Sequence, residues 1–75
     1  MNYANDFPSE EIQLESIKRN PNLIKYIEDP SISVQLSAVT KDPWSIQYIK
    51  DPFKEVKLAA IKEDFSVIKC IKKLF

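Results

Sequence analysis

Apolar residues recur along this chain in a pattern that repeats every 22 positions without a gap. Residues 8–29, 30–51 and 52–73 align, and each segment begins with a proline. Five aligned positions are aliphatic in all three segments: Ile12, Val34 and Val56; Leu14, Leu36 and Leu58; Ile17, Val39 and Ile61; Ile24, Ile46 and Ile68; and Ile27, Ile49 and Ile71. A fixed period near this length is typical of stacked supersecondary structures. We refer to the three segments as the first, second and third units.

Each unit predicts two short helices that form a hairpin. The spacing allows a first helix of about a dozen residues and a second of about eight, short enough to be partly 3₁₀. In the second unit, Val34, Leu36 and Val39 spread over an arc wider than one apolar stripe. This breadth is expected for a helix with neighbours on both sides. The pattern therefore predicts an all-α fold in which three 22-residue helical hairpins stack as a small solenoid.

The chain of 75 residues predicts a single domain. Residues 1–7 precede the pattern and carry Tyr3 and Phe7, which we expect to cover the free face of the first unit. Residues 52–75 form the third unit and end in Leu74 and Phe75, where an Asp-Pro pair would have opened a fourth. We expect these last two residues to fold over the end of the stack or to contact another copy.

Asparagine and aspartate predict where the helices begin. Their side chains accept hydrogen bonds from the free amides of a first turn, and a following proline is tolerated because its missing N–H needs no partner. Five helix starts are predicted in this way, with N-caps at Asn20, Asp29, Asp42, Asp51 and Asp64. The prolines also end the preceding helix. A glycine C-cap is not available, because the chain contains no glycine.

The segment from Asp29-Pro30 through Val34 and Ala38 to Val39 resembles the first helix of HEAT-like and leucine-rich-variant repeats, which share an Asp-Pro-x-x-x-Val-Arg-x-x-Ala pattern. It is also similar to tandem two-helix repeats of bacterial and phage proteins. The likeness covers residues 8–73. It implies a right-handed superhelix that serves as a binding scaffold rather than as an enzyme.

One departure from these repeats concerns the arginine that follows the valine. Gln13, Gln35 and Lys57 stand at that position, so the Asp–Arg ladder of HEAT repeats cannot form. The resemblance implies at most a weaker ladder, in which Asp29 and Asp51 pair with Gln35 and Lys57.

The charges balance over the whole chain, with 11 basic and 11 acidic residues, but not along it. Residues 1–29 carry six acids and three bases, a net charge of −3, whereas residues 52–75 carry six lysines and three acids, a net charge of +3. The molecule is therefore expected to be a weak dipole. Nucleic-acid binding through the lysines of the third unit is a minor alternative, because acids are interleaved among them.

Several residue types needed for catalysis are missing. The chain has no histidine, the commonest general base and metal ligand, and no glycine for a phosphate-binding loop. The single cysteine, Cys70, excludes an internal disulfide and aligns with Tyr26 and Tyr48, so we expect it to be a buried small hydrophobe. We predict no enzymatic activity, cofactor or metal. Without a signal peptide or membrane span, the predicted location is the cytoplasm, that of a host cell if the gene is viral.

Candidate binding residues are those that the stacking does not require. Three positions are polar in two units and large and apolar in the remaining one, and they hold Ile32, Trp44 and Phe53. Such aromatic side chains are common anchors of protein interfaces. For Trp44, packing on Tyr48 one turn later is an equal alternative. Tyr26 and Tyr48 are expected in the core or in a groove.

The sequence thus predicts a non-enzymatic protein-binding module. The specific hypothesis is a phage or prophage product that occupies a surface of a host or defence protein in the cytoplasm. The predicted binding residues are Ile32, Trp44, Tyr48, Phe53, Leu74 and Phe75. The alternatives are a structural homo-oligomer formed through the exposed aromatics and the C-terminal end, and a weak nucleic-acid binder.

Overall fold

A computed structural model describes residues 9–71 of the chain. In chain order its elements are α1 (Glu10–Arg19), the 3₁₀-helix η1 (Pro21–Tyr26), α2 (Ile32–Lys41), the 3₁₀-helix η2 (Pro43–Tyr48), α3 (Lys54–Glu63), the 3₁₀-helix η3 (Phe65–Val67) and α4 (Ile68–Ile71). The described residues contain no β-strand. The predicted all-α class is therefore confirmed for this part of the chain.

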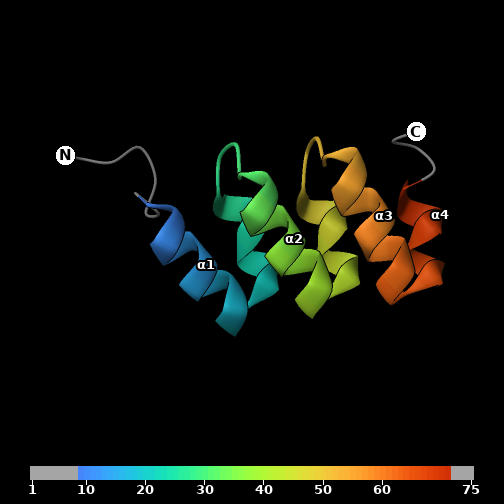
Figure 1. The fold of residues 1–75 in the computed structure, drawn as a ribbon, viewed down its shortest axis with the longest axis horizontal. Coiled ribbons are helices and arrows are strands. Elements are labelled where there is room, and N and C mark those ends of the chain that lie inside the picture. Colours follow the sequence, from blue (N-terminus) through green and yellow to red (C-terminus); the bar gives the residue numbers. More distant parts are fainter. Residues whose placement is uncertain (1–8, 72–75) are drawn as a thin grey trace.

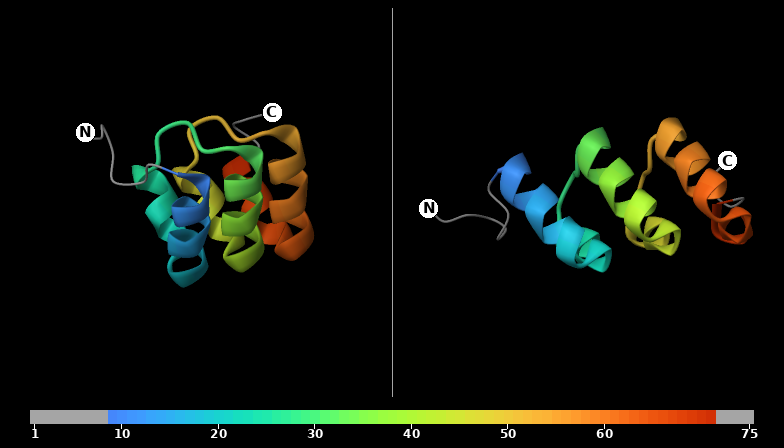
Figure 2. Two further views of the ribbon diagram at one scale, coloured as in Figure 1. Left: turned by 60° about the vertical axis from the view of Figure 1, so that its left-hand side comes forward. Right: turned by 60° about the horizontal axis from the view of Figure 1, so that its bottom comes forward.

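The helices form two rows. The three long helices α1, α2 and α3 lie side by side, and the 3₁₀-helices with α4 form a second row behind them (Figures 1 and 2). Helix α2 contacts both α1 and α3, and each of these helices contacts the 3₁₀-helix that follows it. The chain therefore alternates between the rows as it advances from one unit to the next.

One polar residue ends each α-helix and begins the next 3₁₀-helix. In the first unit, the Asn20 N–H donates to the Ser16 carbonyl (2.9 Å), while the Asn20 Oδ1 accepts from the Asn22 N–H (3.1 Å). Asp42 and Asp64 make the same pair of bonds in the second and third units. All three residues are extended, so the turn needs no glycine in the left-handed region. These three N-caps are the predicted ones.

The other two predicted N-caps, Asp29 and Asp51, are wrong. Helix α2 begins two residues later than predicted, at Ile32, and its N-cap is Ser31, whose Oγ accepts from the Val34 N–H (3.3 Å). Helix α3 likewise begins at Lys54 with Phe53 at the N-cap. Asp29 cannot cap α2 because it has a φ of 58°, in the left-handed region, whereas an N-cap residue is extended. Pro30 and Pro52 thus precede the N-caps instead of opening the helices.

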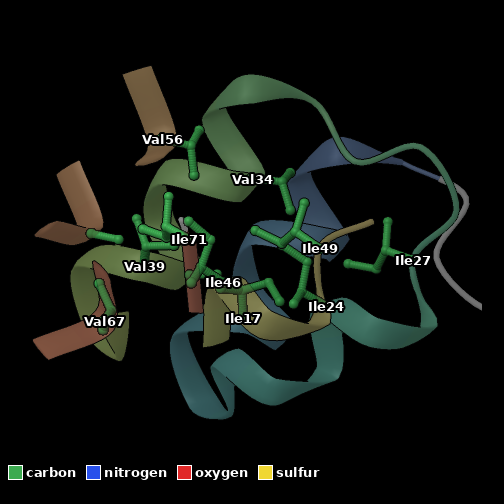
Figure 3. Close-up of a cluster of buried hydrophobic side chains, with 12 residues drawn as sticks. Ile17, Ile24, Ile27, Val34, Val39, Ile46, Ile49, Val56, Val67 and Ile71 are labelled. Atoms are coloured by element: carbon green, nitrogen blue, oxygen red, sulfur yellow. The ribbon is translucent and has the colours of Figure 1, made fainter. Parts of the chain in front are cut away.

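The core lies between the two rows and draws on all three units, and its side chains point toward one another (Figure 3). It consists of Ile17, Ile24, Ile27, Val34, Ala38, Val39, Ile46, Ile49, Val56, Ala60, Val67 and Ile71. The core also holds Ser45, a fully buried residue whose hydroxyl has no hydrogen-bond partner among the described residues. Cys70 is half-buried, so the prediction that it is a buried hydrophobe is only partly met.

Candidate protein-binding surface

The segments that connect the units define one edge of the molecule. Residues 27–31 and 49–53 both loop out on the same side, at the top of Figure 1. We call residues 25–32 and 48–54 the loop edge. Each α-helix runs from this edge toward the residue that ends it, so Asn20, Asp42 and Asp64 lie at the opposite edge, which we call the cap edge (Figure 1).

The predicted binding residues do not all lie together. Ile32, Tyr48 and Phe53 are exposed at the loop edge. Trp44 is also exposed, but as the second residue of η2 it lies at the cap edge. Leu74 and Phe75 lie outside the described residues. The structure therefore brings three of the six predicted residues to one side of the molecule.

Trp44 contacts the third unit. Its Nε1–H donates to the Asp64 Oδ2 at 3.2 Å. The sequence suggested Tyr48 as the intramolecular partner of the Trp44 ring. The partner shown by the hydrogen bond is Asp64, which the sequence did not suggest. Trp44 and Tyr48 belong to opposite ends of η2, separated by about 8 Å along its axis at a rise of about 2 Å per residue.

The Asp64 carboxylate is stabilised in its charged form. The backbone N–H of Ser66 lowers the pKa of Asp64 most, the Ser66 hydroxyl and the Trp44 indole lower it further, and desolvation opposes them. Hydrogen bonds to a carboxylate favour ionisation in this way. At neutral pH, Asp64 therefore acts both as the N-cap of η3 and as the acceptor that anchors Trp44.

A cluster of Lys25, Tyr26 and Tyr48 joins the first two units at the loop edge. The Lys25 Nζ lies 5.2 Å from the ring centroid of Tyr26 and 5.3 Å from that of Tyr48. Each cation–π contact at an exposed site contributes about 0.5–1 kcal/mol. Tyr26 is 61% exposed and Tyr48 is also exposed, so the prediction of a core position is wrong for both. Tyr48 does line a cleft.

This cleft lies between the two connecting segments and has a volume of about 290 Å³. Its charged and aromatic lining residues are Lys25, Glu28, Asp29, Tyr48, Lys50 and Asp51. Ile24, Ile27 and Ile49 also line it and belong to the core. The cleft therefore combines an apolar floor with side chains of both charges.

Gln35 lines this cleft and forms hydrogen bonds to both connecting segments. It is only 3% exposed, its Nε2 donates to the Pro30 carbonyl (3.0 Å), and its Oε1 accepts from the Phe53 N–H (3.2 Å). One side chain thus connects both connecting segments. The expected ladder is wrong about the partners of Gln35, because these bonds go to backbone groups rather than to Asp29 or Asp51.

Phe53 stands where the other units place a capping serine. Ser9 and Ser31 accept from the N–H groups of Ile12 and Val34, both at 3.3 Å, whereas Phe53 makes no side-chain cap bond. Its side chain is 46% exposed. The third helix therefore lacks an interaction that the first two helices have.

Ile32 and Phe53 occupy positions equivalent to those of a hydrogen-bonded pair between the first and second units. Ser31 donates from Oγ to the Glu10 Oε2 at 2.9 Å, which joins the first unit to the second. Moved on by one period of 22 residues, this pair becomes Phe53 and Ile32. Two apolar side chains thus occupy the equivalent positions between the second and third units. Both remain exposed at the loop edge.

Sequence reasoning missed several exposed apolar residues. Phe65, which replaces a proline of the other units, is 70% exposed at the cap edge. Ile12 and Leu58 are exposed although the two aligned positions to which they belong are aliphatic in all three units. A signal for Ile12 and Leu58 existed, because the first and last units each lack one neighbour. Lys25 gave no signal, since its contact with two rings depends on the packing of η1 against η2.

The described residues contain no group of three or more His, Cys, Asp or Glu side chains that could hold a metal ion. None of the helices within residues 9–71 has the length and apolar character required to cross a bilayer. Comparison with protein-family models, curated proteins and solved structures finds no match to this chain. The class of protein is therefore inferred from the geometry of its surfaces.

Proposed function

We propose that this protein is a non-enzymatic protein-binding module, built as a three-repeat right-handed solenoid, that binds its partner through the loop edge. The proposed contact residues are Tyr26, Ile32, Tyr48 and Phe53. The observation that carries the proposal is Phe53, an exposed aromatic residue at an N-cap position that two other units fill with serine.

The stability of α3 does not favour phenylalanine at this position. Ser and Thr are preferred N-caps, and replacing one by a residue that cannot cap costs about 0.5–2 kcal/mol. A side chain that forgoes this stabilisation and leaves nearly half of its surface in water suits an intermolecular contact. Aromatic side chains at partly exposed positions are the usual anchors of protein interfaces.

The surroundings of Phe53 support the same use. Tyr26, Tyr48 and Ile32 add exposed apolar surface along the loop edge, and the neighbouring cleft carries both lysines and carboxylates. An apolar centre with a polar rim is the common arrangement of protein–protein interfaces. The further hypothesis of a phage product that binds a host or defence protein in the cytoplasm belongs to this proposal and is supported by the small size of the chain and by the repeat resemblance.

Phe53→Ser tests the proposal because it separates binding from stability. Immobilised wild-type and variant chains would be used to capture partners from a lysate of the source cell, and their stability measured by urea unfolding. We expect Phe53→Ser to lose a partner that the wild type captures. We also expect it to be at least as stable, since serine restores the N-cap bond of Ser9 and Ser31.

Phe65→Ser is the matched control. It makes the same substitution at an even more exposed phenylalanine, but at the cap edge. We expect it to retain the captured partner. If Phe53→Ser instead keeps the partner and loses stability, then Phe53 serves to pack on Ile32 between the units, and the binding proposal is wrong.

A further inference from the structure

Equivalent positions in the three units differ in burial, and the differences identify two end faces that have no partner among residues 9–71. Val34 and Val56 are fully buried, whereas Ile12, their equivalent in the first unit, is 47% exposed. This position therefore faces the preceding unit, which the first unit lacks. Conversely, Leu58 is 54% exposed, although Leu36, its equivalent in the second unit, packs against the core. Position 58 faces the following unit.

The second row of helices repeats this difference. Leu23 is half-buried while Ser45 and Val67, its equivalents, are fully buried. At the other end Ile68 is half-buried, whereas Ile46 is fully buried. We call Ile12, Ser16 and Leu23 the N-face, and Leu58, Ile61 and Ile68 the C-face.

We propose that the N-face of one copy binds the C-face of a second copy, so that this protein associates head to tail. The two faces are the unpartnered equivalents of surfaces that already meet inside the molecule, where α2 packs between α1 and α3. Joining them would reproduce the junction between the second and third units. Burial of apolar surface supplies the driving force, at about 25 cal/mol per Å².

The net charges of the two ends of the chain also favour a second copy as the binding partner. Glu11 and Glu15 line, together with Ile12, Lys18 and Arg19, an open hollow of about 570 Å³ on the outer side of α1. Lys54 and Lys62 lie one turn before and one turn after Leu58 on α3, so they flank the C-face. The ends of the chain carry net charges of −3 and +3. The two ends of the chain therefore differ in the sign of their net charge, which favours contact between the N-terminal end of one copy and the C-terminal end of another.

At four of the positions just named, charge is absent from the second unit. In the second unit the equivalents of Lys54 and Lys62 are Ile32 and Thr40, which carry no charge. The equivalents of Glu11 and Glu15 there are Ser33 and Ser37, also uncharged. Helix α2 thus lacks charge at these four positions, whereas two of them carry charge of the same sign in both outer units, as Glu11 and Glu55 and as Lys18 and Lys62.

Contact between two different faces does not close on itself. Head-to-tail contacts form open chains of copies unless the rotation happens to complete a ring. The expected behaviour is thus a series of species that grows with protein concentration rather than a single dimer. Added salt should shift the series toward monomer, because it screens exposed charges.

Two variants that each disable one face provide the test. Ile12→Asn removes the apolar centre of the N-face, and Leu58→Asn removes that of the C-face. Both side chains are about half exposed, so we expect both variants to fold, which circular dichroism would verify. Only about half of each side chain remains to be buried on association, so each variant should associate about three- to tenfold more weakly than the wild type.

The decisive sample is an equimolar mixture, followed by sedimentation velocity at several concentrations. Ile12→Asn retains a C-face and Leu58→Asn retains an N-face, so the mixture should form a one-to-one dimer and nothing larger. Gln47→Asn, a change of an exposed residue of the second unit on neither face, should assemble like the wild type. The wild type alone should form larger species that dissociate as salt is raised.

Three results would overturn the proposal: a wild type that stays monomeric at every concentration, a mixture that forms no dimer, or single variants that assemble as well as the wild type. A monomeric wild type that Ile12→Asn destabilises would mean that another part of the same chain, such as Tyr3 and Phe7, covers the N-face. Failure here leaves the loop edge untouched, because Phe53→Ser and its partner are measured separately.

Discussion

At the scale of single residues, hydrogen bonds to side chains decide how this chain turns. Asn20, Asp42 and Asp64 each receive an N–H group two residues later and donate their own N–H to the preceding α-helix. A chain without glycine thereby ends three helices with extended residues. Asp64 also binds Trp44, so one carboxylate fixes both a local turn and a contact between units.

Asp64→Asn is expected to change how stability depends on pH. The pKa of Asp64 lies below its ordinary value of 3.8, so its charge stabilises the fold at pH values above 3.8. That contribution is lost as the pH falls through the lowered pKa. The amide keeps the N-cap, as Asn20 does in the first unit, but carries no charge. The variant should be less stable than the wild type at neutral pH, and the difference should narrow in acid.

Urea unfolding at a series of pH values would measure this difference. Glu63→Gln is the control, because it removes a neighbouring exposed carboxylate at the end of the same helix. The narrowing for Asp64→Asn should exceed any change seen with Glu63→Gln over the same pH range. A difference for Asp64→Asn that stays constant from neutral pH into acid would contradict the role assigned to the charge.

At the scale of elements, the sequence predicted the alternation of long and short helices better than where each helix starts. The Asp-Pro and Asn-Pro pairs look alike, yet Asn20-Pro21 and Asp42-Pro43 open 3₁₀-helices whereas Asp29-Pro30 does not open α2. The distinction depends on tertiary structure, because the chain must cross from one row to the other before α2 can begin. The Asp-Pro pair alone does not indicate how many residues this crossing takes.

The candidate site was predictable only in part, for a related reason. Comparing the units identified Ile32 and Phe53 as residues that differ, and both are exposed at the loop edge. The same comparison could not place Trp44 at the opposite edge, nor predict that the Lys25 Nζ contacts the rings of both Tyr26 and Tyr48. Those arrangements follow from the packing of η1 against η2.

Gln35 connects elements, and its removal should weaken the loop edge as a whole. Gln35→Met keeps the length of the side chain but leaves the Pro30 carbonyl and the Phe53 N–H without their partner. Leaving buried polar groups unsatisfied costs about 1–3 kcal/mol. We expect a loss of unfolding free energy of about that size, measured by urea denaturation.

Gln47→Met makes the same substitution at an exposed glutamine in η2. Surface changes of this kind usually alter stability by less than about 0.5 kcal/mol. Equal effects of the two variants would show that the bonds of Gln35 contribute nothing beyond side-chain packing.

At the scale of the whole molecule, a pattern that is uniform in sequence gives burial that is not uniform in space. Ile12, Val34 and Val56 share one column, yet only the first is exposed, because a unit at the end of a row has one neighbour fewer. The same reasoning predicts what an added unit should do. A unit placed in the middle gains two neighbours and leaves both end faces as they were.

Inserting a second copy of residues 30–51 after Asp51 should therefore give a longer and more stable chain. If the proposed three-repeat solenoid is correct, the fourth unit adds one hairpin and one junction, and stability rises as the sum of these terms. The dependence of unfolding free energy on urea should rise by roughly a third, because it scales with the surface exposed on unfolding. An insert of the same composition in scrambled order is the control and should add no helical signal.

Because the end faces are unchanged, the inserted chain should also associate head to tail as strongly as the wild type. A fourth unit that unfolds separately, at lower urea than the rest, would instead mean that the three units do not stack as equivalent repeats.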